Sequence, residues 1–156
     1  MKKLTSVLVL VLNCLISLAC SCIGESSIDY EIKKSNVVVI GHVINRSEFV
    51  TIDKISGMQI HLANYKIELD SIYKGKVSSK EFEVITGIGG GDCGFEFEMG
   101  KRYIIYAKYK DHYYSKGAKV HKFLNTDICD RTKLEDSLEV SELLKRGKFR
   151  AQKISN

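Results

Sequence analysis

Residues 58–73 decide the fold, and they read MQIHLANYKIELDSIY. Apolar side chains alternate along this stretch, at Met58, Ile60, Leu62, Tyr65, Ile67 and Leu69. The alternation is typical of a half-buried β-strand, but its parity changes near Ala63-Asn64, which predicts a β-bulge there. A long strand that bulges and coils is what a small barrel needs in order to close.

Segments on both sides of this strand complete the predicted barrel. Residues 37–44 are almost entirely apolar and β-branched and predict a buried strand with a bend at Gly41. Polar residues 45–57 predict a hairpin connection, and Asn45 begins a glycosylation sequon by spelling. Further strands are predicted at residues 81–86, 103–110 and, more weakly, 118–124.

A helix is predicted at each end of this set of strands. Residues 26–34 predict a short helix capped by Ser26 or Ser27. Residues 132–135 spell a capping box, and Val140, Leu143, Leu144 and Gly147 are predicted to share one face of the helix that follows. Five strands with a helix at each end predict a mainly β fold, a five-stranded OB-type barrel.

The first nineteen residues are expected to be a signal peptide. Lys2 and Lys3 precede the apolar segment 4–18, and Ser17-Leu18-Ala19 places small residues at the −3 and −1 positions of a cleavage site. We therefore expect a signal peptide at 1–19, one domain at 20–147 and a basic tail at 148–156. Export implies a secreted or extracytoplasmic location, in the periplasm or at the cell surface.

Four cysteines remain after removal of this segment: Cys20, Cys22, Cys93 and Cys129. An even number in an oxidising compartment predicts two disulfides, and the sequence leaves three pairings open. Zinc binding is the competing interpretation. Cys20 and Cys22 are too close for the usual zinc knuckle, and the sequence has no second close pair, so disulfides are favoured.

The composition and the motifs of the sequence argue against several classes of function. The processed chain has 22 basic and 19 acidic residues, a net charge of +3, which does not favour nucleic-acid binding. The four histidines, His42, His61, His112 and His121, form no HxH or HExxH pattern. The glycine-rich run at 87–91 lacks the Lys-Ser/Thr of a phosphate loop and is interpreted as a flexible loop beside a disulfide. We expect no enzyme activity and no cofactor.

Cleavage after Ala19 would make Cys20 the first residue. A disulfide there would fix a primary amine and the neighbouring carbonyl in space, and these two atoms can form a five-membered chelate ring with a metal. The pKa of a free α-amine, about 7.7–8.0, leaves a useful neutral fraction at neutral pH. The sequence around Ser17 also partly resembles a lipobox. Processing there would instead leave Cys20 with an acylated amine and a lipid on its sulfur.

Several short motifs resemble the tissue inhibitors of metalloproteinases and their netrin-like OB domain. The likeness begins with Cys20-Ser21-Cys22 at the cleavage site and ends at Cys129. Between them lie, in the family's order, the segments 39–43 (VIGHV), 72–75 (IYKG), 93–95 (CGF), 100–107 (GKRYIIYA) and 124–129 (LNTDIC). The C-terminal helix resembles the one that closes bacterial, single-domain members.

The resemblance implies a disulfide pairing and a mechanism. It implies the pairs Cys20–Cys93 and Cys22–Cys129. It further implies that the main-chain nitrogen and oxygen of Cys20 chelate the partner protease's catalytic zinc, while the side chain of Ser21 points into the mouth of the specificity pocket. Asp92-Cys93-Gly94 would form the second half of the contact ridge.

Two functions remain open from the sequence. The first is a secreted inhibitor of a zinc metalloendopeptidase, binding through Cys20, Ser21, Cys22, Asp92, Cys93 and Gly94. The alternative is a non-inhibitory netrin-like binding module, which lipidation of Cys20 would make a lipid-anchored protein of the cell envelope. We expect a monomer that binds no nucleic acid and contacts a membrane only if Cys20 is lipidated.

Overall fold

The computed structural model describes residues 20, 22, 27–53, 56–89, 91–110, 113–114, 123–147 and 150–151. Two helices and eight strands are assigned within these residues. In chain order they are α2 (Ile28–Lys34), β1 (Val37–Asp53), β2 (Gln59–Lys74), β3 (Glu81–Gly87), β4 (Arg102–Lys110), β5 (Tyr113–Tyr114), β6 (Phe123–Asn125), β7 (Lys133–Leu134), α3 (Ser137–Arg146) and β8 (Arg150–Ala151).

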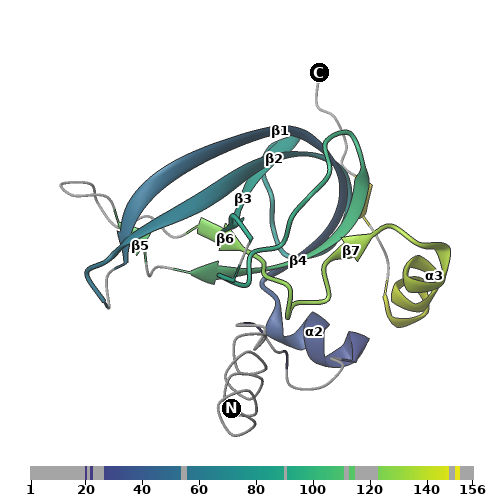
Figure 1. Ribbon diagram of the computed structural model, residues 1–156. Helices are drawn as coiled ribbons and strands as arrows, with labels where there is room; N and C mark the ends of the chain where they lie inside the picture. The colour runs from purple at the N-terminus through teal and green to yellow at the C-terminus, as the bar shows by residue number, and fades with distance from the viewer. Residues whose placement is uncertain are drawn as a thin grey trace, which may run out of the picture.

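Five of these strands close into a ring. Neighbouring strands follow the order β1-β2-β3-β6-β4, and β4 pairs back onto β1. Only the β3–β6 pair is parallel among the strands of this ring. This closure confirms the predicted OB-like, five-stranded barrel. β1 and β2 form the long curved ribbon that arches over the molecule in Figure 1.

The hairpin connection predicted at 45–57 is wrong for residues 45–53, which continue the strand; the two paired strands are joined only between Asp53 and Gln59. β1 continues to Asp53 and stays in register with β2 from Asn45 to Ile52. Side chains 44–50 of β1 are exposed, which is why their composition resembles a loop. Pairing with β2 satisfies the backbone of this segment even though it buries few side chains. The backbone N–H of Gly57 donates to the carbonyl of Asp53 at 2.8 Å, and Gly57 has a φ of 70°.

The irregularities that bend the long ribbon are not at the predicted position. Pairing is continuous at Ala63 and Asn64, so the bulge expected there is wrong. Register shifts occur instead between Val38 and Val39, between Ile40 and Gly41, and between Val43 and Asn45. The parity change in β2 arises because Leu62 and Ala63 are both buried, one on each side of the strand.

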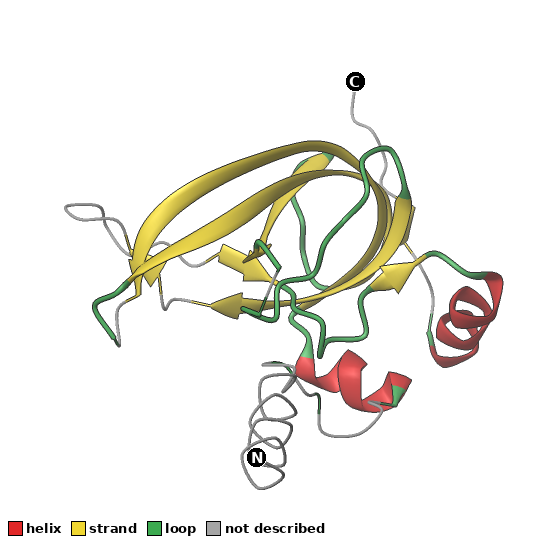
Figure 2. Ribbon diagram, viewed as in Figure 1, coloured by secondary structure: helices red, strands yellow, loops and turns green. Residues whose placement is uncertain are grey.

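The core has two parts. Inside the barrel, buried side chains of all the long strands pack together, including Val39, Tyr65, Ile67, Val84 and Ile105. Outside it, Val38, Ile40, Ile104 and Tyr106 pack against Leu143 of α3 and the partly buried Ile28 and Ile32 of α2. Figure 2 shows both helices outside the barrel wall, where their apolar faces cover this second layer.

The C-terminal helix begins later than the predicted capping box. Its N-cap is Asp136, whose carboxylate accepts a hydrogen bond from the backbone N–H of Glu139 at 2.7 Å. Thr132 is buried instead, and its hydroxyl accepts the backbone N–H of Tyr106. The prediction of a cap at Thr132 is therefore wrong, because the barrel uses that hydroxyl to satisfy a strand.

A buried charged network docks α3 onto the barrel. The Tyr106 hydroxyl donates to Glu139 at 2.7 Å, and Arg131 donates two hydrogen bonds of 2.6 Å to the same carboxylate. Burial by itself favours neutral Glu139, but the hydrogen bonds from Arg131 and Tyr106 outweigh it and lower its pKa. Burial and the neighbouring carboxylate raise the pKa of Tyr106.

The remaining sequence predictions concern the two ends of the chain and the segment 118–124. The short N-terminal helix agrees with the prediction, and its cap is Ser27. Of the predicted strand at 118–124, residues 118–122 lie outside the described residues, as does the whole predicted signal peptide. Within the segment 148–156, Arg150 and Ala151 pair with Ile72 and Ser71 of β2. No helix among the described residues is long and apolar enough to cross a membrane.

Candidate functional site

Two disulfides attach the start of the domain to the barrel. Cys20 is bonded to Cys93 with a Cα–Cα distance of 5.5 Å, and Cys22 is bonded to Cys129 with a Cα–Cα distance of 5.2 Å. These are the two pairs that the resemblance implies. Ser21 lies outside the described residues. We call residues 20, 22 and 92–94 the N-terminal ridge.

Asp92 shapes the loop that carries Cys93. Its carboxylate accepts three backbone N–H groups: Ile88 at 2.8 Å, Gly89 at 3.0 Å and Gly94 at 2.9 Å. Cys93 itself has a φ of 61°, a left-handed conformation that a residue with a side chain adopts only when its surroundings hold it there. The carboxylate of Asp92 is thus turned onto its own loop, and it fixes the backbone to which Cys20 is tethered.

Two glycines let the ends of this loop touch. A Cβ on Gly94 would lie 2.2 Å from the carbonyl oxygen of Gly87, and a Cβ on Gly87 would lie 2.4 Å from the Asp92 carboxylate. No real side chain fits at such distances. The glycine-rich run was predicted to be a flexible loop beside a disulfide. At Gly87 the structure gives a different reason for the glycine, which is close backbone packing.

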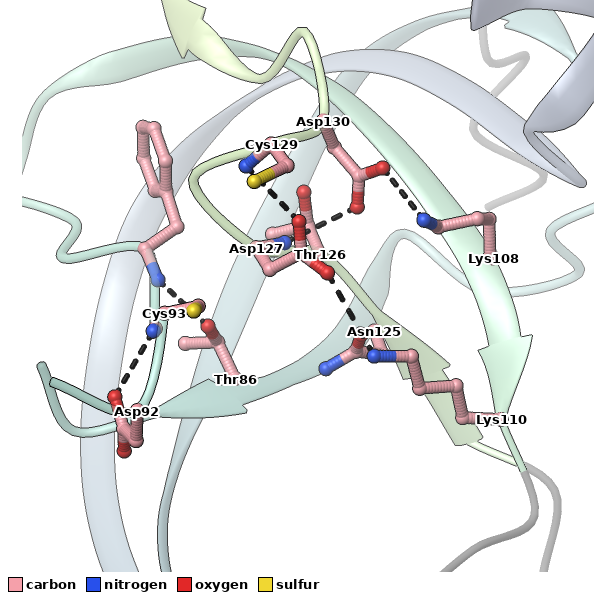
Figure 3. A network of polar contacts seen from close by, with 12 residues as sticks. Thr86, Asp92, Cys93, Lys108, Lys110, Asn125, Thr126, Asp127, Cys129 and Asp130 are labelled. Atoms are coloured by element: carbon pink, nitrogen blue, oxygen red, sulfur yellow. Dashed lines mark hydrogen bonds and ion pairs between the residues drawn. The ribbon is translucent and has the colours of Figure 1, made fainter. Parts of the chain in front are cut away.

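The loop that carries Cys129 is built in a similar way (Figure 3). Asp127 accepts the backbone N–H of Cys129 at 3.0 Å, and Asp130 accepts the N–H of Asp127 at 3.1 Å. The buried Asp130 carboxylate also forms ion pairs with Lys108 of β4 at 2.6 Å and Lys34 of α2 at 3.3 Å. Burial alone would lower the pKa of Lys34, but Asp130 and Glu31 outweigh it and raise that pKa.

The two cysteine loops also contact each other. The backbone N–H of Ile128 donates to the carbonyl of Cys93 at 3.0 Å, and Gly94 forms an antiparallel bridge with Asp127. The hydroxyl of Thr86, which is fully buried in β3, accepts the N–H of Phe95 at 2.8 Å. Residues far apart in the sequence therefore form one rigid support, and the start of the domain is fastened to it at two points.

Sequence reasoning identified the cysteines, Asp92 and Gly94 but missed Thr86, Asp127 and Asp130. Of these three residues, Asp127 had a local signal in the sequence. Asp92 and Asp127 each accept the N–H of the residue two positions later, the Asx-turn that aspartate favours. No comparable local signal marks Thr86 or Asp130, because their partners lie on other elements.

The described residues include no group of three or more histidine, cysteine, aspartate or glutamate side chains placed to hold a metal ion. Of the four histidines, His42 contacts Asp70 at 3.0 Å, and His61 is exposed on β2. His112 and His121 lie outside the described residues.

Comparison with known families gives an independent result. A family model described as tissue inhibitor of metalloproteinase matches residues 18–139. The match runs from just before Cys20 into the first turn of α3 and includes all four cysteines of the two disulfides. Comparison with individual curated proteins gives no significant match.

Proposed function

Since the chain belongs to the family of tissue inhibitors of metalloproteinases, we propose that it inhibits a zinc metalloendopeptidase through the N-terminal ridge. In this proposal, removal of residues 1–19 frees the α-amine of Cys20. That amine and the Cys20 carbonyl oxygen then chelate the protease's catalytic zinc and displace the water that attacks the substrate. The observation that carries the proposal is the Cys20–Cys93 disulfide on a loop held by Asp92.

Rigidity is what makes a terminal amine an effective inhibitor. A free chain end would lose conformational entropy on binding, whereas an end already held by two disulfides loses less. The support under the ridge is rigid, since Asp92, Gly94 and Asp127 are fixed by backbone hydrogen bonds. Residues 20–22 would enter the protease cleft, with the side chain of Ser21 at the mouth of its specificity pocket. The segment Asp92-Cys93-Gly94 would contact the protease beside them.

The proposed ligand predicts a direction for the pH dependence. Zinc binds the unprotonated amine, so the proton must leave before the chelate forms. Affinity should therefore increase as the pH rises through about 7.7–8.0, the ordinary pKa range of an α-amine. Below that range a growing fraction of the inhibitor carries a protonated amine and cannot bind.

The disulfide also bears on the form of the processed protein. A sulfur bonded to Cys93 is not available for a lipid thioether, so the pairing of Cys20 supports a secreted protein with a free amine. We propose a monomer that acts outside the cytoplasm, where disulfides are stable.

The experiment that tests the proposal adds one alanine before Cys20 in the processed protein. Inhibition would be measured against a panel of zinc metalloendopeptidases with a fluorogenic peptide substrate. The extended protein should keep its fold and lose inhibition by about 100-fold or more, because its Cys20 nitrogen is an amide and no longer a zinc ligand. A matched control carries the extra alanine after Asn156. Equal inhibition by the two extended proteins would exclude chelation by Cys20.

A further inference from the structure

A groove of about 410 Å³ opens directly beside the ridge, between the ends of β1, β2, β3, β4 and β6. Asp92 and Cys93 form part of its wall, so anything bound at the ridge also faces this groove. Ile60 and the buried Leu62 supply an apolar floor. Its volume lies in the range of specific ligand pockets and is ample for one long side chain.

The groove contains an unsatisfied hydrogen-bond acceptor. Asn125 is only 3% exposed. Its Nδ2 donates to the carbonyl of Ile85 at 2.7 Å, while its Oδ1 is buried and accepts no hydrogen bond from the residues that the structure describes. A buried oxygen without a donor is unfavourable by about 1–3 kcal/mol, so the site favours a ligand that brings one.

The charges around this oxygen indicate which donor fits. The lining residues include three aspartates, Asp53, Asp92 and Asp127, and one lysine, Lys110. The Asp92 carboxylate is turned onto its own loop, so it contributes its charge to the groove and not a free acceptor. Lys110 lies 3.7 Å from Asp127, and His61 stands exposed at the rim. Figure 3 shows Lys110, Asn125 and Asp127 gathered at one point. With His61 neutral, the formal charge of the lining is three negative against one positive, so the groove favours a cation.

We propose that this groove takes a basic side chain of the inhibited protease, foremost an arginine. A guanidinium is planar, carries five N–H donors and remains charged, so it can donate to the Asn125 oxygen and to a carboxylate together. Its aliphatic stem would lie on Ile60 and Leu62. This inference rests on the proposed function, to which it adds a second recognition element outside the zinc-binding contact.

The first test uses a probe that needs no protease. N-acetyl-arginine amide would be titrated into the ¹⁵N-labelled processed protein, with N-acetyl-citrulline amide, a neutral ligand of nearly the same shape, as the control. The arginine probe should shift the side-chain amide signal of Asn125 and the backbone signal of Gly87, and it should bind about tenfold more tightly than citrulline. Absence of these shifts, or equal affinity for the two probes, would overturn the proposal.

Two charge variants distinguish a specific arginine site from nonspecific electrostatic attraction. Lys110→Gln removes the competing cation and should strengthen arginine binding, whereas His61→Lys places an ammonium at the rim and should weaken it. His61→Gln is the neutral counterpart with which His61→Lys is compared. Both positions are exposed or partly exposed in strands, so the barrel should remain folded. Unchanged binding in both charge variants would contradict the assignment.

The last test returns to the protease. His61→Lys should inhibit about tenfold more weakly than its neutral counterpart His61→Gln. The alanine extension before Cys20 should leave arginine binding intact, since the groove does not use the terminal amine. If the processed protein without the extra alanine binds arginine but inhibits no protease, only the proposed function is refuted. Inhibition that persists without arginine binding, or that His61→Lys leaves unaltered, would refute the groove's role alone.

Discussion

At the scale of single residues, one carboxylate organises the ridge. Asp92 accepts three N–H groups of its own loop, and that loop holds Cys93 in its left-handed conformation. Replacing Asp92 with alanine removes all three bonds at once. We expect Asp92→Ala to lower the free energy of unfolding by about 1–2 kcal/mol, measured by urea denaturation, and to weaken inhibition because Cys20 is less rigidly held.

A nearby acidic residue provides the matched control. Glu96 is exposed on the same segment, and its carboxylate carries none of these loop hydrogen bonds. Glu96→Ala removes the same charge and should change stability by less than about 0.5 kcal/mol. If the two variants were equally stable and equally inhibitory, the loop would not depend on the Asp92 carboxylate.

Gly94 gives a second prediction at this scale. Its missing Cβ makes room for the Gly87 carbonyl, and backbone atoms cannot move aside as a side chain can. Gly94→Ala should therefore destabilise the protein by about 2 kcal/mol or more in thermal unfolding. Gly147→Ala is the comparison, because its added Cβ would meet the hydroxyl end of Tyr73 at 2.9 Å. That side chain can shift, so a larger loss at Gly147 than at Gly94 would contradict this interpretation.

At the scale of elements, the docking of α3 depends on a charge. Glu139 is buried and accepts hydrogen bonds from Tyr106 and Arg131. Glu139→Gln should destabilise the protein by about 2 kcal/mol at pH 7, because hydrogen bonds to a charged group become neutral ones. Chemical denaturation of both proteins would measure the difference.

The same carboxylate predicts a pH dependence. Its pKa in the folded protein lies below the ordinary value of 4.5. Its contribution to stability is therefore complete above that value and is lost as the pH falls through the folded pKa. The stability difference between the native protein and Glu139→Gln should shrink in acid. A difference that stayed constant from pH 7 to pH 3 would show that the charge of Glu139 is not what docks the helix.

The elements also show how far the sequence could predict this structure. β3 and β4 were predicted almost to the residue. Burial of one face gives β3 an alternating sequence, whereas β4 is buried on both faces and reads as a continuous apolar run. The outer half of β1 was missed, since its side chains are exposed and only its pairing with β2 makes it a strand. The helix cap was misplaced because Thr132 is taken by Tyr106, a contact between elements.

Some features of the candidate site could likewise be predicted from the sequence, and others could not. The sequence alone left three disulfide pairings open, because the partners are 73 and 107 residues apart and only the folded barrel brings them together. The resemblance supplied the pairing. The groove with its unsatisfied Asn125 oxygen had no sequence signal, since its lining comes from five strands and the loops between them.

At the scale of the whole molecule, the disulfides restrain the chain more than any local contact does. The Cys22–Cys129 bond closes a sequence separation of 107, and a loop of this length corresponds to roughly 4–5 kcal/mol in the chain-entropy estimate. It also joins the start of the domain to a turn that Asp130 connects to α2 and β4. The Cys22–Cys129 disulfide thus connects the N-terminal ridge, through the turn that carries Asp130, to α2 and to β4.

Two matched variants separate stability from tethering. The double change Cys22→Ser and Cys129→Ser should lower the free energy of unfolding by about 4 kcal/mol, measured by urea denaturation. It should weaken inhibition only partly, because Cys93 still holds Cys20. Cys93→Ser removes the shorter closure at a similar or smaller loss of stability, but it frees Cys20 from the loop shaped by Asp92 and should abolish inhibition. Equal loss of inhibition in both would mean that global stability, and not the position of the Cys20 amine, determines activity.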